Sequence, residues 1–123
     1  MLINKAKQLY ADCDNADPNI TILMPFRLPE FKDRNVFYTM FLGQLIHKYA
    51  IEQTVNDEWV KFNRESFYVN KNDKEGWKSL KSTCYRLEKK GLIETKFENG
   101  SNFVRLNKSN DEIFNPELYK RPE

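Results

Sequence analysis

One stretch constrains the fold most, because three local signals follow one another within residues 73–107. Apolar side chains recur there at helical spacing and form a single face of a helix: Trp77, Leu80, Cys84 and Leu87. Gly91 follows two lysines, and a cationic last turn before a glycine is a common helix stop. The pattern predicts an amphipathic helix over residues 73–90, with Asn72 or Asp73 as its N-cap.

A β-hairpin is predicted directly after this helix. Residues 92–97 and 102–106 flank Asn99-Gly100, and Asn-Gly is the strongest short signal for a hairpin turn. Upstream, residues 59–62 alternate like a short strand, and Asn63 is a suitable cap for a short helix over residues 64–70. A short helix, a polar turn and a longer basic helix are the parts of a helix-turn-helix.

The remainder of the chain predicts two further helices and two irregular segments. Residues 2–12 form an amphipathic pattern, whereas a helix from Asp33 or Asn35 to residue 50 is apolar on more than one face and must be covered on several sides. Gly43 in its middle suggests a close helix crossing. Residues 20–29 are extended, and Pro25 and Pro29 restrict them to a sheet edge or to non-sheet conformations. The tail, residues 108–123, either docks through its apolar residues or frays.

Positive charge is concentrated on the predicted long helix. The whole chain carries a formal net charge of +2, but residues 71–96 contain eight Lys or Arg against four acids. That segment is therefore +4 and the other 97 residues sum to −2. A local excess of this kind is the electrostatic footprint expected of a nucleic-acid-binding element.

The phase of the helix predicts which side chains face away from the core. With the apolar stripe inward, Lys78, Ser79 and Ser82 are the best candidates for contact with base edges, because the N-terminal half of a recognition helix usually reaches them. Lys74 and Lys81 would flank these contacts on phosphate, and Arg86 and Lys89 would hold the DNA backbone. The remaining candidates are one helix residue and two at the hairpin tip: Tyr85, Asn99 and Ser101.

These motifs resemble a known domain family. The run Tyr85-Arg-Leu-Glu-Lys-Lys-Gly-Leu-Ile-Glu-Thr95, followed by a hairpin ending Phe103-Val-Arg-Leu-Asn107, is similar to winged-helix domains of bacterial and phage origin. With Asp57-Glu-Trp-Val60 ahead of a short helix, it also resembles the N-terminal domains of phage replisome-organiser and plasmid replication-initiator proteins. The Leu-Glu-Lys-Lys-Gly-Leu-Ile core is similar to that of small bacterial transcription regulators as well. The resemblance covers residues 35–107. It departs from the family where Asn70-Lys-Asn-Asp-Lys-Glu-Gly76 replaces a small Gly-x-Ser turn.

The resemblance implies an α+β winged helix-turn-helix with a two- or three-stranded wing. Three segments are expected: an N-terminal helix and extended segment (1–34), the winged-helix domain (35–107) and a tail (108–123). The implied function is binding of double-stranded DNA by the helix over residues 73–90, in transcription regulation or replication of a phage or mobile element. A homodimer is expected, with a replication or transcription protein as a further partner.

Other function classes have less support in the sequence. There is no Gly-rich phosphate loop, and the single histidine, His47, has no nearby nucleophile, so we expect no enzyme, no cofactor and no metal site. Asp57 and Glu58 are read as solvated acids of a connector. The two cysteines are far apart, Cys84 is expected to be a reduced core thiol, and a cytoplasmic protein follows. The alternative is a winged helix that contacts protein instead of DNA, through the apolar helix and residues 20–28.

Overall fold

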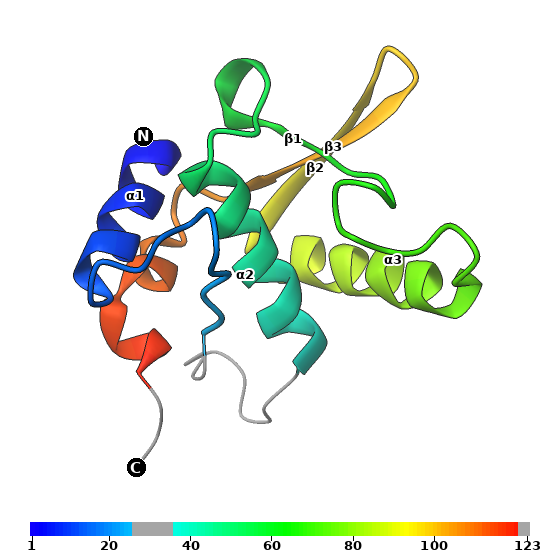
Figure 1. Ribbon diagram of the computed structural model, residues 1–123. Helices are drawn as coiled ribbons and strands as arrows, with labels where there is room; N and C mark the ends of the chain where they lie inside the picture. The colour runs from blue at the N-terminus through cyan, green and yellow to red at the C-terminus, as the bar shows by residue number, and fades with distance from the viewer. Residues whose placement is uncertain (26–35, 121–123) are drawn as a thin grey trace.

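The computed structural model describes residues 1–25 and 36–120, and within them the chain forms three α-helices and one three-stranded antiparallel sheet (Figure 1). The predicted α+β class is therefore confirmed. In this part of the chain, no helix has the length and apolar character needed to cross a membrane. The elements, in chain order, are α1 (Leu2–Asp12), α2 (Val36–Ala50), the 3-10 turn η1 (Asn56–Glu58), β1 (Val60–Lys61), α3 (Lys74–Lys89), β2 (Ile93–Glu98), β3 (Ser101–Leu106), η2 (Asp111–Phe114) and η3 (Pro116–Tyr119).

Strand β3 lies at the centre of the sheet, between β1 and β2. It pairs with β2 from Ile93↔Leu106 out to Glu98↔Ser101, and with β1 at Val60↔Val104. The β2–β3 turn has positive φ at both central residues, 51° at Asn99 and 77° at Gly100. Positive φ at both positions defines the hairpin turn that Asn-Gly favours, so the hairpin prediction is confirmed.

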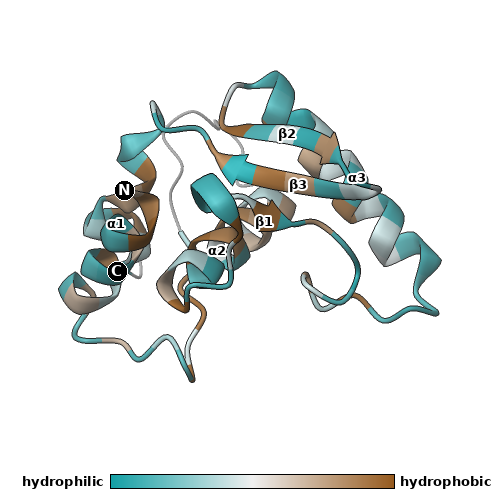
Figure 2. Cartoon of the chain, turned by 90° about the horizontal axis from the view of Figure 1, so that it is seen from above, coloured by the Kyte–Doolittle hydropathy of each residue, from teal (hydrophilic) through white to brown (hydrophobic). Residues whose placement is uncertain are grey.

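Helix α2 is the centre of the core, with α1 on one side and α3 on another (Figure 1). Its residues Phe41, Leu42, Leu45 and Ile46 are completely buried, as expected for a helix that is apolar on several faces. Figure 2 shows apolar segments on α2, β1 and β3, the elements that surround this shared interior. The backbone N–H of Leu106 donates to the Tyr49 hydroxyl at 3.0 Å, which ties β3 to α2.

The two ends of the described chain pack on this core. Helix α1 buries four residues, and the tail buries Ile113, Leu118 and Tyr119, so the tail docks up to residue 120 and does not fray. Glu58 is buried, and its carboxylate accepts the backbone N–H groups of Leu2 at 3.1 Å and Ile3 at 2.7 Å. The interpretation of Glu58 as a solvated acid was therefore wrong, because it caps the N-terminus of α1, whereas Asp57 is exposed.

Gly43 permits a close approach, but to an irregular segment and not to a helix. A Cβ atom at Gly43 would lie 2.7 Å from the carbonyl oxygen of Leu23. Of the predicted extended segment, residue 20 is in a turn and residues 21–25 are not in a strand, while residues 26–29, like the proposed caps Asp33 and Asn35, lie outside the described residues. His47 is buried beside this segment, with Nε2 2.8 Å from the carbonyl oxygen of Pro18.

The predicted helix over residues 64–70 is absent, and the structure has turns at 64–68 instead. The expected cap does form, because Asn63 Oδ1 accepts the N–H of Ser66 at 2.7 Å. The chain then leaves the helical path, since Val69 N–H bonds to the Arg64 carbonyl, five residues back, and Tyr68 has a φ of 56°. Phe67 still faces inward as predicted, where its ring stacks on Phe41 at 5.1 Å between centroids. The turn thus still delivers the Phe67 ring to the aromatic core.

Candidate nucleic-acid interface

Helix α3 is capped at both ends by the residues that the sequence predicted. The Asp73 side chain accepts the N–H of Gly76 at 2.8 Å, which satisfies one of the unpaired donors of the first turn. At the other end Gly91 has a φ of 75°, and Leu92 N–H donates to the Leu87 carbonyl at 3.0 Å. This is the hydrogen-bond pattern of a glycine-terminated helix, and it turns the chain directly into β2.

The predicted inward stripe of α3 is confirmed. Cys84 and Leu87 are buried, and Trp77 and Leu80 are half-buried against the core. Trp77 stacks on Phe62 with 5.2 Å between ring centroids. Thr83 is also buried and donates its hydroxyl to the Ser79 carbonyl, which widens the inward face by one residue toward α2.

The opposite side of α3 faces solvent and holds most of the predicted contact residues. At about 100° per residue, Lys78, Ser82 and Lys89 lie nearest the direction opposite the core. Seven of the predicted residues on this helix are exposed: Lys74, Lys78, Lys81, Ser82, Tyr85, Arg86 and Lys89. Ser79 is half-buried, because it lies at the border with α2 and lines a hollow there with Phe37.

Three cations of this face have side chains that make no hydrogen bond or ion pair with the described residues: Lys74, Lys78 and Arg86. Two others lie over aromatic rings, Lys81 with Nζ 5.8 Å from the centre of Trp77 and Lys89 with Nζ 4.8 Å from the centre of Tyr85. Such contacts at exposed sites hold a side chain without neutralising its charge. The exposed face of α3 therefore keeps its positive potential, with Glu75 as its exposed acid.

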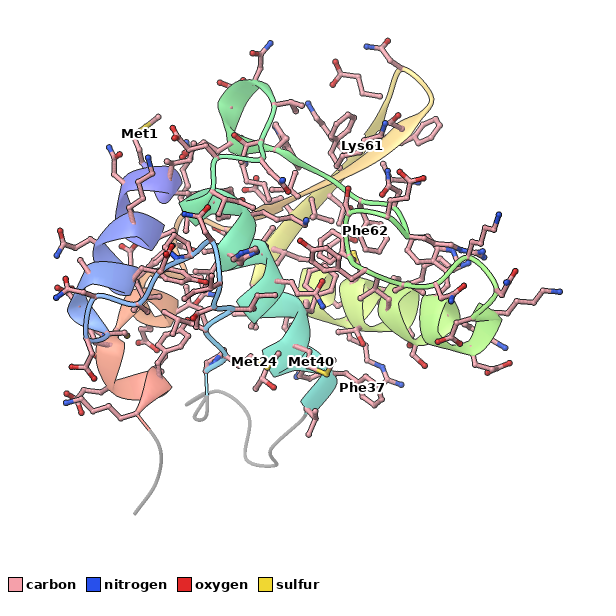
Figure 3. The ribbon with its side chains drawn as sticks, viewed as in Figure 1. Met1, Met24, Phe37, Met40, Lys61 and Phe62 are labelled. Atoms are coloured by element: carbon pink, nitrogen blue, oxygen red, sulfur yellow. The ribbon has the colours of Figure 1, made fainter. Side chains whose placement is uncertain are left out.

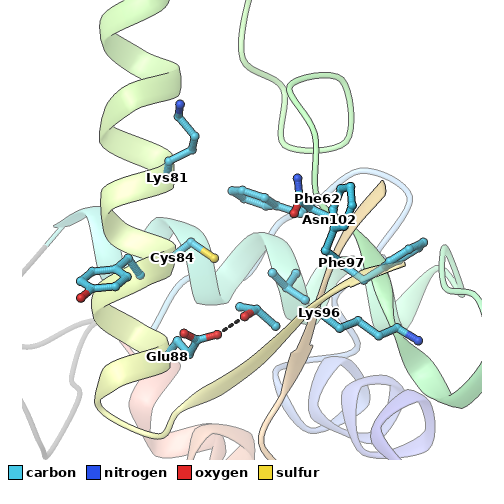
Figure 4. Close-up of a pocket in the computed structure, with 11 residues that line it drawn as sticks. Phe62, Lys81, Cys84, Glu88, Lys96, Phe97 and Asn102 are labelled. Atoms are coloured by element: carbon cyan, nitrogen blue, oxygen red, sulfur yellow. Dashed lines mark hydrogen bonds between the residues drawn. The ribbon is translucent and has the colours of Figure 1, made fainter. Parts of the chain in front are cut away.

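A hollow of about 330 Å³ separates α3 from the β2–β3 hairpin (Figure 4). Lys81 and Tyr85 lie on its helix side, Phe97 and Asn102 lie on its hairpin side, and Cys84 lies at its base. Burial raises the pKa of the Cys84 thiol to about 12, with a smaller contribution from Glu88, so this thiol is protonated and unreactive near neutral pH. The Glu88 carboxylate accepts a hydrogen bond from the Thr95 hydroxyl across the hollow.

The hairpin offers few free cations. Lys96 pairs with Glu98 at 2.8 Å and lies 4.7 Å from the centre of the Trp59 ring, and Arg105 pairs with Glu94 at 2.6 Å. Both cations are thus paired with a carboxylate and lie over the Trp59 ring. At the tip Asn99 is exposed, and Ser101 is half-buried as the first residue of β3. The tip presents polar groups without a free positive charge.

Two exposed aromatic residues beside α3 were missed by sequence reasoning. Phe97 is 70 % exposed at the mouth of the hollow (Figure 4), and Phe37 is 59 % exposed at the start of α2 (Figure 3). The face of β2 on which Phe97 lies could have been predicted from strand alternation, because alternate residues such as Ile93, Thr95 and Phe97 share one side of a strand. Phe37 had no such signal, since it belongs to a helix that is apolar on nearly every face.

Cys13 and Cys84 are both free, and residues 1–25 and 36–120 contain no group of three or more His, Cys, Asp or Glu side chains placed to hold a metal ion. No protein-family model, curated protein or solved structure matches this chain.

Proposed function

We propose that this chain is a winged-helix protein that binds double-stranded DNA with α3 in the major groove. The element order supports this proposal: helix α2, strand β1, a turn region, helix α3 and the β2–β3 hairpin, with sheet order β1-β3-β2. The observation that carries it is the solvent-exposed face of α3. This face presents five exposed cations and Ser82 on one surface, opposite a stripe that packs on the core.

The geometry suggests how the contacts divide. A major groove accommodates one α-helix, and residues on its N-terminal half reach the base edges, so Lys78, Ser79 and Ser82 are proposed to lie near bases. Lys74 and Lys81 flank them and would contact phosphates, as would Arg86 and Lys89 further along the helix. Tyr85 lines the hollow from α3 and would offer its hydroxyl to a DNA backbone that passes there. The tip residues Asn99 and Ser101 would add uncharged hydrogen bonds.

The biological setting follows from the sequence resemblance and remains part of the proposal. A role in transcription regulation or replication of a phage or mobile element fits a small module of this kind. As a homodimer it would place two α3 helices in successive major grooves, roughly 34 Å apart. A two-fold symmetric binding site is the result expected from selection of bound sequences.

Fluorescence anisotropy with a labelled mixed-sequence duplex tests the proposal. If α3 neutralises four or five phosphates, the slope of log K against log salt concentration is about −4. The affinity then falls on the order of 10²-fold between 50 and 200 mM salt, from a micromolar or tighter dissociation constant at low salt. Absence of binding by folded protein, or binding that does not depend on salt, would refute it.

One observation favours a second function, a module that contacts protein instead of DNA. The first turns of α2 expose three apolar side chains, Val36 at 55 %, Phe37 at 59 % and Met40 at 39 %. Neighbouring apolar residues that remain exposed often mark a binding surface. If folded protein fails to bind duplex DNA, this surface becomes the primary site.

A further inference from the structure

An apolar groove lies between α2, the turns after β1 and the first half of α3, and we call it the α2–α3 groove. It has a volume of about 390 Å³, and its main apolar walls are Met40, Phe41, Phe67, Tyr68 and Leu80, with Phe37 at one end. One wall of the groove is formed by the turns at residues 64–68, which contribute Phe67 and Tyr68. Figure 3 shows Phe37 and Met40 projecting from the end of α2 that lies nearest α3.

The rim of the groove is hydrophobic and accessible. Met40 is 39 % exposed and Tyr68 is 63 % exposed, and Phe37 adds a third accessible apolar side chain one turn before Met40. The groove is polar at one point on its α2 side, where Gln44 Oε1 is buried and has no hydrogen-bond partner among the described residues. A buried acceptor without a donor is costly, so an occupant that donates an N–H or O–H there would gain stability.

The groove continues along α3 into a second hollow of about 300 Å³, lined by Phe37, Lys78, Ser79, Ser82, Thr83 and Arg86. Among the described residues, none that lines either hollow is acidic, and the side chains of Lys78 and Arg86 make no ion pair with this part of the chain. At the other end, Lys48 is buried behind the groove, with Nζ 5.4 Å from the Phe67 ring and 5.2 Å from the Tyr68 ring. The exposed positive charge beside the apolar floor is therefore that of Lys78 and Arg86, which complements an acidic partner.

We propose that the α2–α3 groove binds an acidic amphipathic helix of a partner protein. Apolar residues of that helix, spaced i, i+3 and i+7, would pack on Met40, Phe37 and Leu80, and its carboxylates would pair with Lys78 and Arg86. Lys78, Ser79, Ser82 and Arg86 also belong to the face proposed to read DNA. The partner helix and duplex DNA therefore exclude each other, and the partner acts as an antagonist of DNA binding. This last consequence rests on the proposed function, whereas the groove itself does not.

A synthetic probe tests the groove directly. The probe is a helix-stapled peptide of about four turns with Leu at i, i+3, i+7 and i+10 and Glu at its flanking positions. The matched control peptide carries Lys in place of each Glu. We expect the acidic peptide to shift the amide NMR signals of residues 37–44 and 76–86 and to bind at least tenfold more tightly than the basic one. Equal binding of the two peptides, or shifts elsewhere in the protein, would overturn the proposal.

Single substitutions distinguish binding in the groove from nonspecific hydrophobic binding of the peptide. Met40→Ala and Phe37→Ala are expected to weaken peptide binding about tenfold each, while Ile20→Ala, at an apolar position that is 83 % exposed outside the groove, leaves it unchanged. Thermal melting confirms that each variant folds. If Met40→Ala instead converts a dimer into a monomer in sedimentation, and the peptide does not bind, a second copy occupies the groove and the partner proposal is wrong.

Competition with labelled duplex distinguishes this proposal from the proposed function. Peptide binding together with displacement of duplex supports both the groove and the antagonism. Peptide binding by a protein that shows no affinity for duplex supports the groove and refutes the DNA function. Simultaneous binding of peptide and duplex refutes the antagonism.

Discussion

Replacing Glu58 by glutamine tests whether α1 is an integral part of the fold. The Glu58 carboxylate accepts two backbone N–H groups, from Leu2 at 3.1 Å and from Ile3 at 2.7 Å, and the first of these hydrogen bonds is buried. A glutamine side chain keeps one acceptor oxygen and turns an NH₂ group toward the other N–H. The substitution also removes a negative charge from the N-terminus of a helix, where the macrodipole favours it.

The expected loss follows from these contacts. A hydrogen bond to a charged group contributes about 1.5–3 kcal/mol, and Glu58→Gln removes one such bond and weakens the other. The helix-dipole interaction adds roughly 0.3–1 kcal/mol. We therefore expect the free energy of unfolding to fall by about 2–3 kcal/mol, with fraying of α1 limiting any larger loss because water can then reach the freed N–H groups.

The assay is urea unfolding at neutral pH, followed by circular dichroism and by fluorescence of Trp59 and Trp77. Asp57→Asn is the matched control, because Asp57 is the adjacent carboxylate, it is exposed, and it also has a positive φ. The control is expected to change stability by less than about 0.5 kcal/mol. If Glu58→Gln changes stability no more than Asp57→Asn does, the cap contributes little and the reasoning is refuted.

Three further predictions concern the interior. Gly43→Ala gains about 1 kcal/mol of helix propensity, but its Cβ would lie 2.7 Å from the Leu23 carbonyl oxygen. We expect the clash to prevail, so that urea unfolding shows a net loss of about 1–2 kcal/mol in the free energy of unfolding. A stabilised variant would contradict the close packing. Tyr49→Phe leaves the buried N–H of Leu106 without an acceptor and should cost about 1–3 kcal/mol, measured in the same way; an unchanged midpoint would argue against that hydrogen bond. Burial lowers the pKa of Lys48 in the folded state below its value in the unfolded chain. At a pH between these two pKa values the unfolded state binds more protons than the folded state, so the stability of the protein rises with pH. The stability gained by Lys48→Met should therefore be largest near pH 7 and shrink as pH rises toward 10, and a constant difference would be inconsistent with a lowered pKa.

Local signals in the sequence were sufficient for α3 and the hairpin. The stripe from Trp77 to Leu87, the Asp73 cap, Gly91 and Asn99-Gly100 each act within a few residues, so they could be read without tertiary information. The exposed side of α3, which holds most of the candidate site, followed from the same helical phase.

Features that depend on distant residues could not be predicted. Glu58 caps a helix 55 residues earlier in the chain, and nothing near Glu58 indicates that role. Asn63 formed its predicted cap, yet the chain then makes a turn in which Phe67 packs on Phe41. The α2–α3 groove is lined in part by that turn, so sequence reasoning missed it together with Phe37 at its end.

The most direct test of DNA binding by α3 compares Lys78→Ala with Lys61→Ala in the duplex anisotropy assay. Both lysines are exposed, but Lys61 lies on β1 beside buried Val60 and so points away from the core, on the opposite side of the sheet from α3 (Figure 3). We predict that Lys78→Ala weakens binding several-fold and makes the salt slope less steep by about 1, with unchanged thermal stability, while Lys61→Ala binds as the parent does. Equal effects of the two substitutions, or a larger effect of Lys61→Ala, would contradict it.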